Sequence, residues 1–142
     1  MKIAINGCHG GFSLSPEALV YIANKLGEPI YFFRWLFEEK RYVPISIEEA
    51  RTYWLDAKVY KIPNPNEVDI SDLPKYAWYN RPKSNNLDRT DPLLIEAIEV
   101  LKEKANGAFA TLKVVEVPDD VKWHIAEYDG WEWVAEDHRK WE

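Results

Sequence analysis

The chain has 142 residues and a formal net charge of −6, from 18 Lys and Arg against 24 Asp and Glu. It holds 7 Trp, 8 Tyr and 5 Phe but one Cys and one Met. A single cysteine excludes an intrachain disulfide and a zinc site built from cysteines alone, since both need several thiols. The excess of acid argues against a coat for duplex DNA, because Lys and Arg supply the phosphate contacts of such proteins.

The N-terminal segment predicts a strand, a glycine-rich loop and a helix. Residues 2–6 have the composition of a β-strand, and residues 7–11 are Gly-Cys-His-Gly-Gly, whose glycines can take positive φ angles. Ser15 is a typical N-cap, and Pro16 fits the first helical position. We therefore expect one main helix over about residues 16–26.

The middle of the chain is rich in aromatic residues and proline. Residues 30–45 predict strands that lie in the core or at a subunit interface, because the run is too apolar for a half-exposed strand. Ser46 and Glu49 have the spacing of a capping box, which predicts a short helix to about Leu55. Residues 62–87 contain four of the nine prolines and predict a long irregular loop, a kind of segment that often carries function.

The second main helix is predicted over about residues 92–105. Asp91 is a typical cap, and Pro92 fits the position after it. Residues 109–117 and 121–128 predict two strands that pair with each other as a hairpin.

A further turn is predicted at Asp129-Gly130, followed by a short strand or helix over residues 131–141. Nothing in the sequence marks a repeat or a domain boundary. Together the elements predict a single α+β domain over residues 1–142, with a mixed or antiparallel sheet and two main helices.

The distribution of charge, rather than net charge, indicates a binding segment. Between Lys75 and Arg89, four basic residues stand against one acidic residue, a balance of +3. The same window contains Tyr76, Trp78, Tyr79 and several asparagines. Arginine forms bidentate hydrogen bonds with phosphate, aromatic rings stack on bases, and amides hydrogen-bond with base edges. This combination is typical of a pocket for a compact nucleotide.

The glycine-rich loop is the second half of the predicted pocket. Backbone N–H groups in a loop between a strand and a helix can bind an anion, and the helix dipole adds to the attraction. The loop lacks the Gly-Lys-Ser/Thr sequence of a phosphate loop, so a tight turn without a ligand is an equal alternative. The ligand-binding residues predicted for the whole pocket are Asn6, Cys8, His9, Gly10, Gly11, Phe12, Ser13, Trp78, Tyr79, Asn80, Arg81, Arg89 and Asp91.

Distinct roles follow from the chemistry of these side chains. Arg81 and Arg89 are expected to hold phosphate. The aromatic ring of Trp78 or of Tyr79 is expected to stack on a base. Asn6 or Asn80 would hydrogen-bond with polar edges of the ligand.

Arg89 and Asp91 also have a structural interpretation. Asp91 is sufficient as the cap of the second helix. Arg89 could pair with Asp91 or Glu127 inside the fold, which would remove it from a ligand site.

The sequence predicts no metal, no cofactor and no catalytic residue. Cys8 and His9 are neighbours, and neighbouring side chains of an extended chain point to opposite faces. His9, His124 and His138 are widely separated and lack the spacing of zinc ligands.

Apolar runs are too short for membrane segments. The longest, residues 30–37, cannot span a bilayer, and residues 1–11 lack the apolar stretch of a signal peptide. These features predict a soluble cytoplasmic protein without a membrane partner.

Several stretches together carry a family resemblance. They resemble a family of small, mostly uncharacterised proteins of tailed bacteriophages and prophages, over roughly residues 1–27 and 88–141. The matching stretches are KIAINGCHGGFSLS at 2–15, DRTDPLLI at 88–95, ANG at 105–107, VVEVPDD at 114–120 and EYDG at 127–130.

The resemblance implies a protein of an infected host cell, and small acidic phage proteins often counter host defence. By analogy, one such class consists of viral sponges, which sequester cyclic ADP-ribose isomers or cyclic oligonucleotides. Sponges are typically homo-oligomers with pockets at subunit boundaries. The leading hypothesis is therefore a homo-oligomeric protein that sequesters a small phosphorylated nucleotide signal without turnover.

Two further hypotheses belong to other functional classes. An acidic, Trp-rich tail over residues 127–142 would let the protein bind and inhibit a host defence enzyme. Alternatively, Glu127, Asp129 or His138 would act as acid or base in an enzyme that processes a nucleotide.

Overall fold

Helices and antiparallel strands form an α+β fold, as the sequence predicts. The structure is a computed structural model that describes residues 1–78 and 89–137. Its helices and strands are β1 (Lys2–Asn6), α1 (Pro16–Leu26), β2 (Tyr31–Leu36), β3 (Arg41–Pro44), α2 (Ile47–Thr52), β4 (Ala57–Tyr60), α4 (Pro92–Leu101), β5 (Leu112–Glu116), β6 (Trp123–Tyr128) and β7 (Trp131–Glu136).

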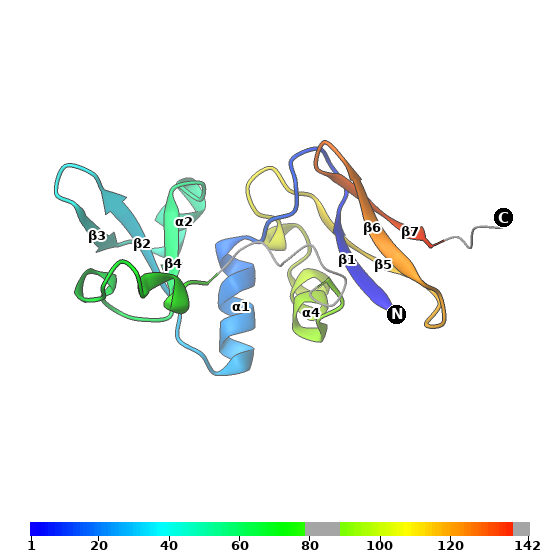
Figure 1. The fold of residues 1–142 in the computed structure, drawn as a ribbon, viewed down its shortest axis with the longest axis horizontal. Coiled ribbons are helices and arrows are strands. Elements are labelled where there is room, and N and C mark those ends of the chain that lie inside the picture. Colours follow the sequence, from blue (N-terminus) through cyan, green and yellow to red (C-terminus); the bar gives the residue numbers. More distant parts are fainter. Residues whose placement is uncertain (79–88, 138–142) are drawn as a thin grey trace.

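In the described part of the chain, the strands form three small sheets rather than one. β1 pairs with β5, β6 pairs with β7, and β2 lies between β3 and β4, all antiparallel. Helices α1 and α4 pack against each other in the middle of the molecule. The three-stranded sheet lies at one end of the long axis, and the two strand pairs lie at the other (Figure 1).

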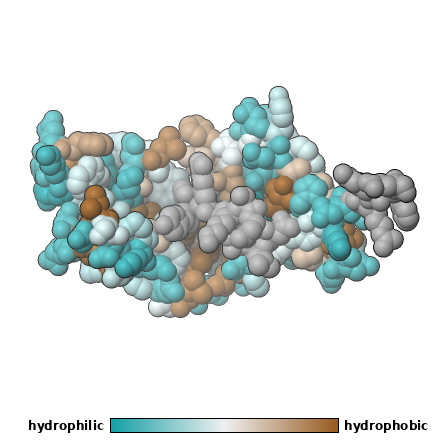
Figure 2. Space-filling view, in the orientation of Figure 1, coloured by the Kyte–Doolittle hydropathy of each residue, from teal (hydrophilic) through white to brown (hydrophobic). Residues whose placement is uncertain are grey.

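One hydrophobic core joins the two main helices with the three-stranded sheet and the β1–β5 pair. It brings Phe12 and Leu14 from the N-terminal loop together with Leu19 of α1, Phe32 of β2 and Ile95 of α4. On the face seen in Figure 2, hydrophilic residues predominate at both ends of the molecule. The buried apolar surface is therefore continuous across the middle, where the helices meet.

Both main helices begin where their caps predict. The Ser15 hydroxyl accepts a hydrogen bond from the Ala18 N–H, and Gly27 ends α1 with a φ angle of 68°. The end predicted for the second helix is wrong, because α4 stops at Leu101. Lys102 takes a φ angle of 55°, and the chain continues as a 3₁₀ turn to Ala105. In the described residues 1–78 and 89–137, no helix combines the length and hydropathy needed to cross a bilayer.

The hairpin predicted between residues 109–117 and 121–128 is wrong. Asp129 and Gly130 both have positive φ angles and form a two-residue turn, so β6 pairs with β7 instead. The partner of β5 is β1, with Lys2 opposite Glu116. The residues after the turn form a strand, which is one of the two structures expected there.

The three-stranded sheet contains β4, a strand that the sequence did not predict. The short helix predicted from the Ser46–Glu49 capping box, α2, is confirmed, although it ends at Thr52 and not at about Leu55. Residues 61–78 turn back over one face of this sheet through two 3₁₀ turns, Pro65–Glu67 and Leu73–Tyr76. That face holds a second small core, made of Phe33, Tyr60 and Leu73.

Candidate functional site

The glycine-rich loop packs closely against two other segments of the chain. A Cβ atom on Gly10 would lie 1.6 Å from the Phe109 carbonyl oxygen, so only glycine fits there. On the other side, a Cβ atom on Gly130 would lie 2.5 Å from the His9 carbonyl oxygen. The glycines at both places therefore have a packing reason that needs no ligand.

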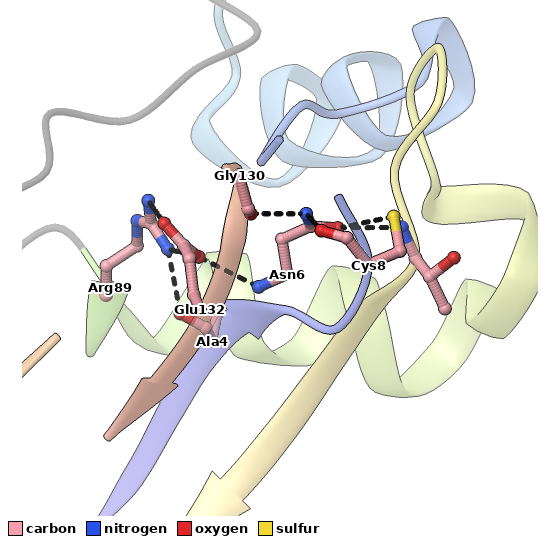
Figure 3. A network of polar contacts seen from close by, with 7 residues as sticks. Ala4, Asn6, Cys8, Arg89, Gly130 and Glu132 are labelled. Carbon is pink, nitrogen blue, oxygen red and sulfur yellow. Dashed lines mark hydrogen bonds and ion pairs between the residues drawn. The ribbon is translucent and has the colours of Figure 1, made fainter. Parts of the chain in front are cut away.

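Asn6 is fully buried at the junction of these segments (Figure 3). Its amide nitrogen donates to the carbonyl oxygens of Cys8 (2.6 Å) and Gly130 (2.9 Å), and its oxygen accepts from the Thr111 N–H (2.8 Å). The prediction that Asn6 contacts a ligand is corrected, because these hydrogen bonds occupy its polar atoms.

Arg89 is also an interior residue, with 3% of its surface exposed. Its guanidinium forms a bidentate ion pair with Glu132 at 2.7 and 2.9 Å and donates to the Ala4 carbonyl oxygen at 3.2 Å. The centroid of the Phe12 ring lies 3.8 Å from the Cζ atom of Arg89. The face of the ring therefore attracts the positive charge of the guanidinium. The predicted phosphate contact of Arg89 is corrected: it pairs inside the fold, with Glu132 rather than with Asp91 or Glu127.

Other predicted site residues have structural roles as well. Ser13 is buried, and its hydroxyl donates to the Ala108 carbonyl oxygen at 3.3 Å. Asp91 caps α4 by accepting from two backbone N–H groups, as its structural interpretation expected. His9 is exposed, and its ring packs edge-on against Trp131 with ring centroids 5.1 Å apart.

Cys8 is partly buried, and its thiol donates to the Phe109 carbonyl oxygen at 3.0 Å. Burial by itself raises the pKa of this thiol. Hydrogen bonds from the Gly10 backbone and the Thr111 side chain outweigh burial, so the pKa of Cys8 lies below its usual range.

Alkylation should therefore detect the Cys8 thiolate at lower pH than in an unstructured peptide. We expect the pH midpoint of the iodoacetamide reaction to fall below that of a cysteine peptide and to return to it in urea, where the hydrogen bonds are lost. A native midpoint equal to or above that of the peptide would contradict this prediction.

The structure brings the glycine-rich loop and Trp78 together at one pocket of about 410 Å³. Gly10 and Ser13 line one side, and Trp78 and Lys58 line the other. Trp78 is fixed by a hydrogen bond from its Nε1 to the Pro29 carbonyl oxygen at 2.9 Å. Among its described lining residues, the pocket thus contains the predicted ring of Trp78 and a single cationic residue, Lys58. Three other predicted ligand residues, Tyr79, Asn80 and Arg81, lie outside the described residues, as does His138.

A larger groove of about 670 Å³ lies on the three-stranded sheet. Among the described residues, its lining includes two lysines, Lys40 in the β2–β3 turn and Lys58 on β4. Arg34 of β2 also borders the groove, but its guanidinium lies over the Tyr53 ring, 4.6 Å from the ring centroid, and strand alternation directs it to the face opposite Trp35. Asp56 is the one acidic residue among the described residues of this lining. The groove therefore has a cationic lining on a chain whose net charge is negative.

Aromatic rings form the wall of this groove. Trp35 and Tyr42 lie opposite each other on paired strands and pack edge-to-face, with ring centroids 4.7 Å apart. The centroids of the Tyr42 and Tyr60 rings lie 5.6 Å apart. The Asn66 side chain accepts a hydrogen bond from the Tyr42 N–H and donates one to the Tyr42 carbonyl oxygen. These contacts fix the orientation of the rings before any ligand binds.

Comparison with protein-family models, curated proteins and solved structures finds no match to this chain. The resemblance to phage proteins and the expected homo-oligomer therefore stay predictions. Function has to be inferred from the chemistry of the groove and the surfaces.

Sequence reasoning missed the cationic groove because its residues come from separate elements. Strand pairing places Lys58 opposite Phe33, next to the ring wall, although the two are far apart in sequence. Among the residues that the structure describes, no three His, Cys, Asp or Glu side chains group as metal ligands do.

Proposed function

We propose that the protein binds a small phosphorylated nucleotide in the groove on the three-stranded sheet and holds it without turnover. The observation that carries the proposal is the joint lining of the groove by Lys40 and Lys58 and by the rings of Trp35 and Tyr42. Cations supply the contacts that phosphate needs, and aromatic rings supply surfaces on which a base stacks.

The size and the rigidity of the groove support this ligand class. Its volume of about 670 Å³ lies in the range typical of small-molecule sites. Because the Trp35–Tyr42 pair is already packed, little side-chain freedom is lost when a base binds.

The lining residues favour binding over catalysis. Among the described residues of the groove there is no histidine, no cysteine and no pair of carboxylates. These are the groups that most often act as nucleophile, general acid or general base. Sequestration of an intact nucleotide agrees with this lining better than hydrolysis does.

Neutralising two of the cations should weaken nucleotide binding strongly. We expect Lys40→Gln and Lys58→Gln each to raise the Kd of the bound nucleotide by about tenfold, since a charge-assisted hydrogen bond contributes about 1.5–3 kcal/mol. Calorimetric titration with cyclic oligonucleotides, ADP-ribose and cyclic ADP-ribose measures the effect.

Lys122→Gln is the matched control, because it removes the same charge just before β6, at the opposite end of the molecule from β3 (Figure 1). Its Kd should stay within about twofold of the wild type. Chromatography of ligand released by heat should return the intact nucleotide. The absence of saturable binding would argue against this groove. So would a loss of nucleotide binding in Trp78→Ala together with unchanged binding in Lys40→Gln.

A further inference from the structure

The hairpin β6–β7 has two faces of different character. Along β7, Glu132 is 5% exposed, whereas its neighbours Trp131 and Trp133 are 43% and 46% exposed. Because successive side chains of a strand point to opposite faces, Glu132 marks the inner face and the two tryptophans mark the outer face.

The strand register places further residues on this outer face. Tyr128 lies opposite Trp131, Ala126 opposite Trp133 and His124 opposite Ala135. Tyr128 is 73% exposed, and the His9 ring packs against both Tyr128 and Trp131. We call the rings of His9, Tyr128, Trp131 and Trp133 the aromatic strip.

The aromatic strip is held in a fixed orientation by the inner face. Glu132 is bonded to Arg89 and accepts a hydrogen bond from the Asn6 N–H at 2.8 Å. The hairpin therefore cannot turn its tryptophans toward the core without breaking a buried ion pair. Exposure of the strip is a property of the fold, and exposed apolar strips often mark interaction sites.

The charges around the strip define its partner. Residues 119–137 contain seven carboxylates against Lys122 as the one lysine or arginine. By the register, Glu127 and Glu136 lie on the same side of the hairpin as Glu132, but both are exposed, and Asp129 lies in the turn next to Tyr128. None of these three carboxylates forms an ion pair with another described residue. Aromatic faces and unpaired carboxylates both attract cations, and both disfavour phosphate.

We propose that the aromatic strip is a docking surface for an arginine- or lysine-rich segment of a partner protein. Guanidinium and ammonium groups would lie on the faces of Trp131 and Trp133. Asp129 in the turn and the exposed Glu127 close to it would pair with neighbouring charges of the partner segment. This surface is separate from the cationic groove and has the opposite sign, so the proposal does not depend on the nucleotide.

A synthetic peptide of alternating arginine and glycine is the probe, and the same peptide with glutamate is its counterpart. We expect the arginine peptide to bind the full chain and to quench tryptophan fluorescence, and the glutamate peptide to do neither. Trp131→Ala with Trp133→Ala should weaken binding by about tenfold, and Glu127→Gln with Asp129→Asn by about fivefold. Asparagine suits the positive φ angle of Asp129, so the turn is retained.

The matched control is Glu48→Gln with Glu103→Gln, which removes the same charge from α2 and from the 3₁₀ turn after α4. It should change the Kd by less than about twofold. Equal weakening by both charge pairs would show general attraction and overturn the proposal, as would full binding by the tryptophan variant. Sedimentation that shows self-association through this face, lost in Lys58→Gln, would also overturn it, because the occupant would then be a second copy.

Discussion

Replacing Glu132 with alanine is expected to lower the free energy of unfolding by about 3–5 kcal/mol, the largest effect we expect from any single change. The substitution leaves the Arg89 guanidinium in the interior without its counter-charge. It also removes the acceptor of the Asn6 N–H. The Nε atom of Arg89 already lacks an acceptor among the described residues, so the site offers no local replacement. Urea denaturation monitored by tryptophan fluorescence gives the value.

A control on the same hairpin separates this effect from loss of a surface charge. Glu136→Ala removes an exposed carboxylate from β7 and should change the free energy of unfolding by less than about 0.5 kcal/mol. In a double-mutant cycle, Arg89→Met combined with Glu132→Ala should be less destabilised than the sum of the two single variants. Additive effects would mean that the ion pair contributes nothing specific.

Replacing Asn6 with alanine is expected to lower the free energy of unfolding by about 2–5 kcal/mol. The amide connects Cys8, Gly130 and Thr111, and without it the backbone groups of the last two lose their hydrogen-bond partner. A backbone group left unpaired in the interior costs about 1–3 kcal/mol. Thermal or urea unfolding measures the change, and hydrogen exchange should show faster exchange at the Thr111 amide.

The variant Asn6→Asp serves as a test of the two halves of the amide. Aspartate keeps an acceptor for the Thr111 N–H but has no donor for the Gly130 carbonyl oxygen. Protection of the Thr111 amide should be retained in this variant while global stability falls. Stability of Asn6→Ala within about 0.5 kcal/mol of the wild type would contradict the role of Asn6 as a junction.

Local signals predicted the helices well. Ser15, Asp91 and the Ser46–Glu49 capping box each act within one helical turn, so their effect is visible in the sequence alone. The end of α4 could not be placed in the same way. It depends on the backbone of Lys102, which takes an unusual conformation in a sequence that carries no stop signal there.

Strand pairing was predicted less well, because it depends on partners distant in the chain. The Asp129-Gly130 turn is a strong hairpin signal, and it acts on the strands beside it. Once β6 pairs with β7, β5 is left to pair with β1, at the other end of the chain. The competition between these pairings is decided by total burial, which no local pattern contains.

The candidate site shows the same limit. The roles predicted for Asn6 and Arg89 assumed exposed side chains, and burial changes the meaning of both residue types. Glu132 is one of many acids near the end of the chain, and nothing in its local sequence marks it as the partner of Arg89. The meeting of Gly10 with Trp78 was predicted from chemistry, and the structure places both at one pocket.

The pairing of β1 with β5 and the bond from Asn6 to Glu132 also govern the order of assembly. Asn6 and Glu132 lie 126 positions apart, so the chain between them must close into a long loop before their hydrogen bond forms. Proteins dominated by such distant contacts fold slowly. During synthesis on the ribosome, β1 cannot pair until β5, near the end of the chain, has emerged. The unpaired edge of β1 is exposed to other chains during that time.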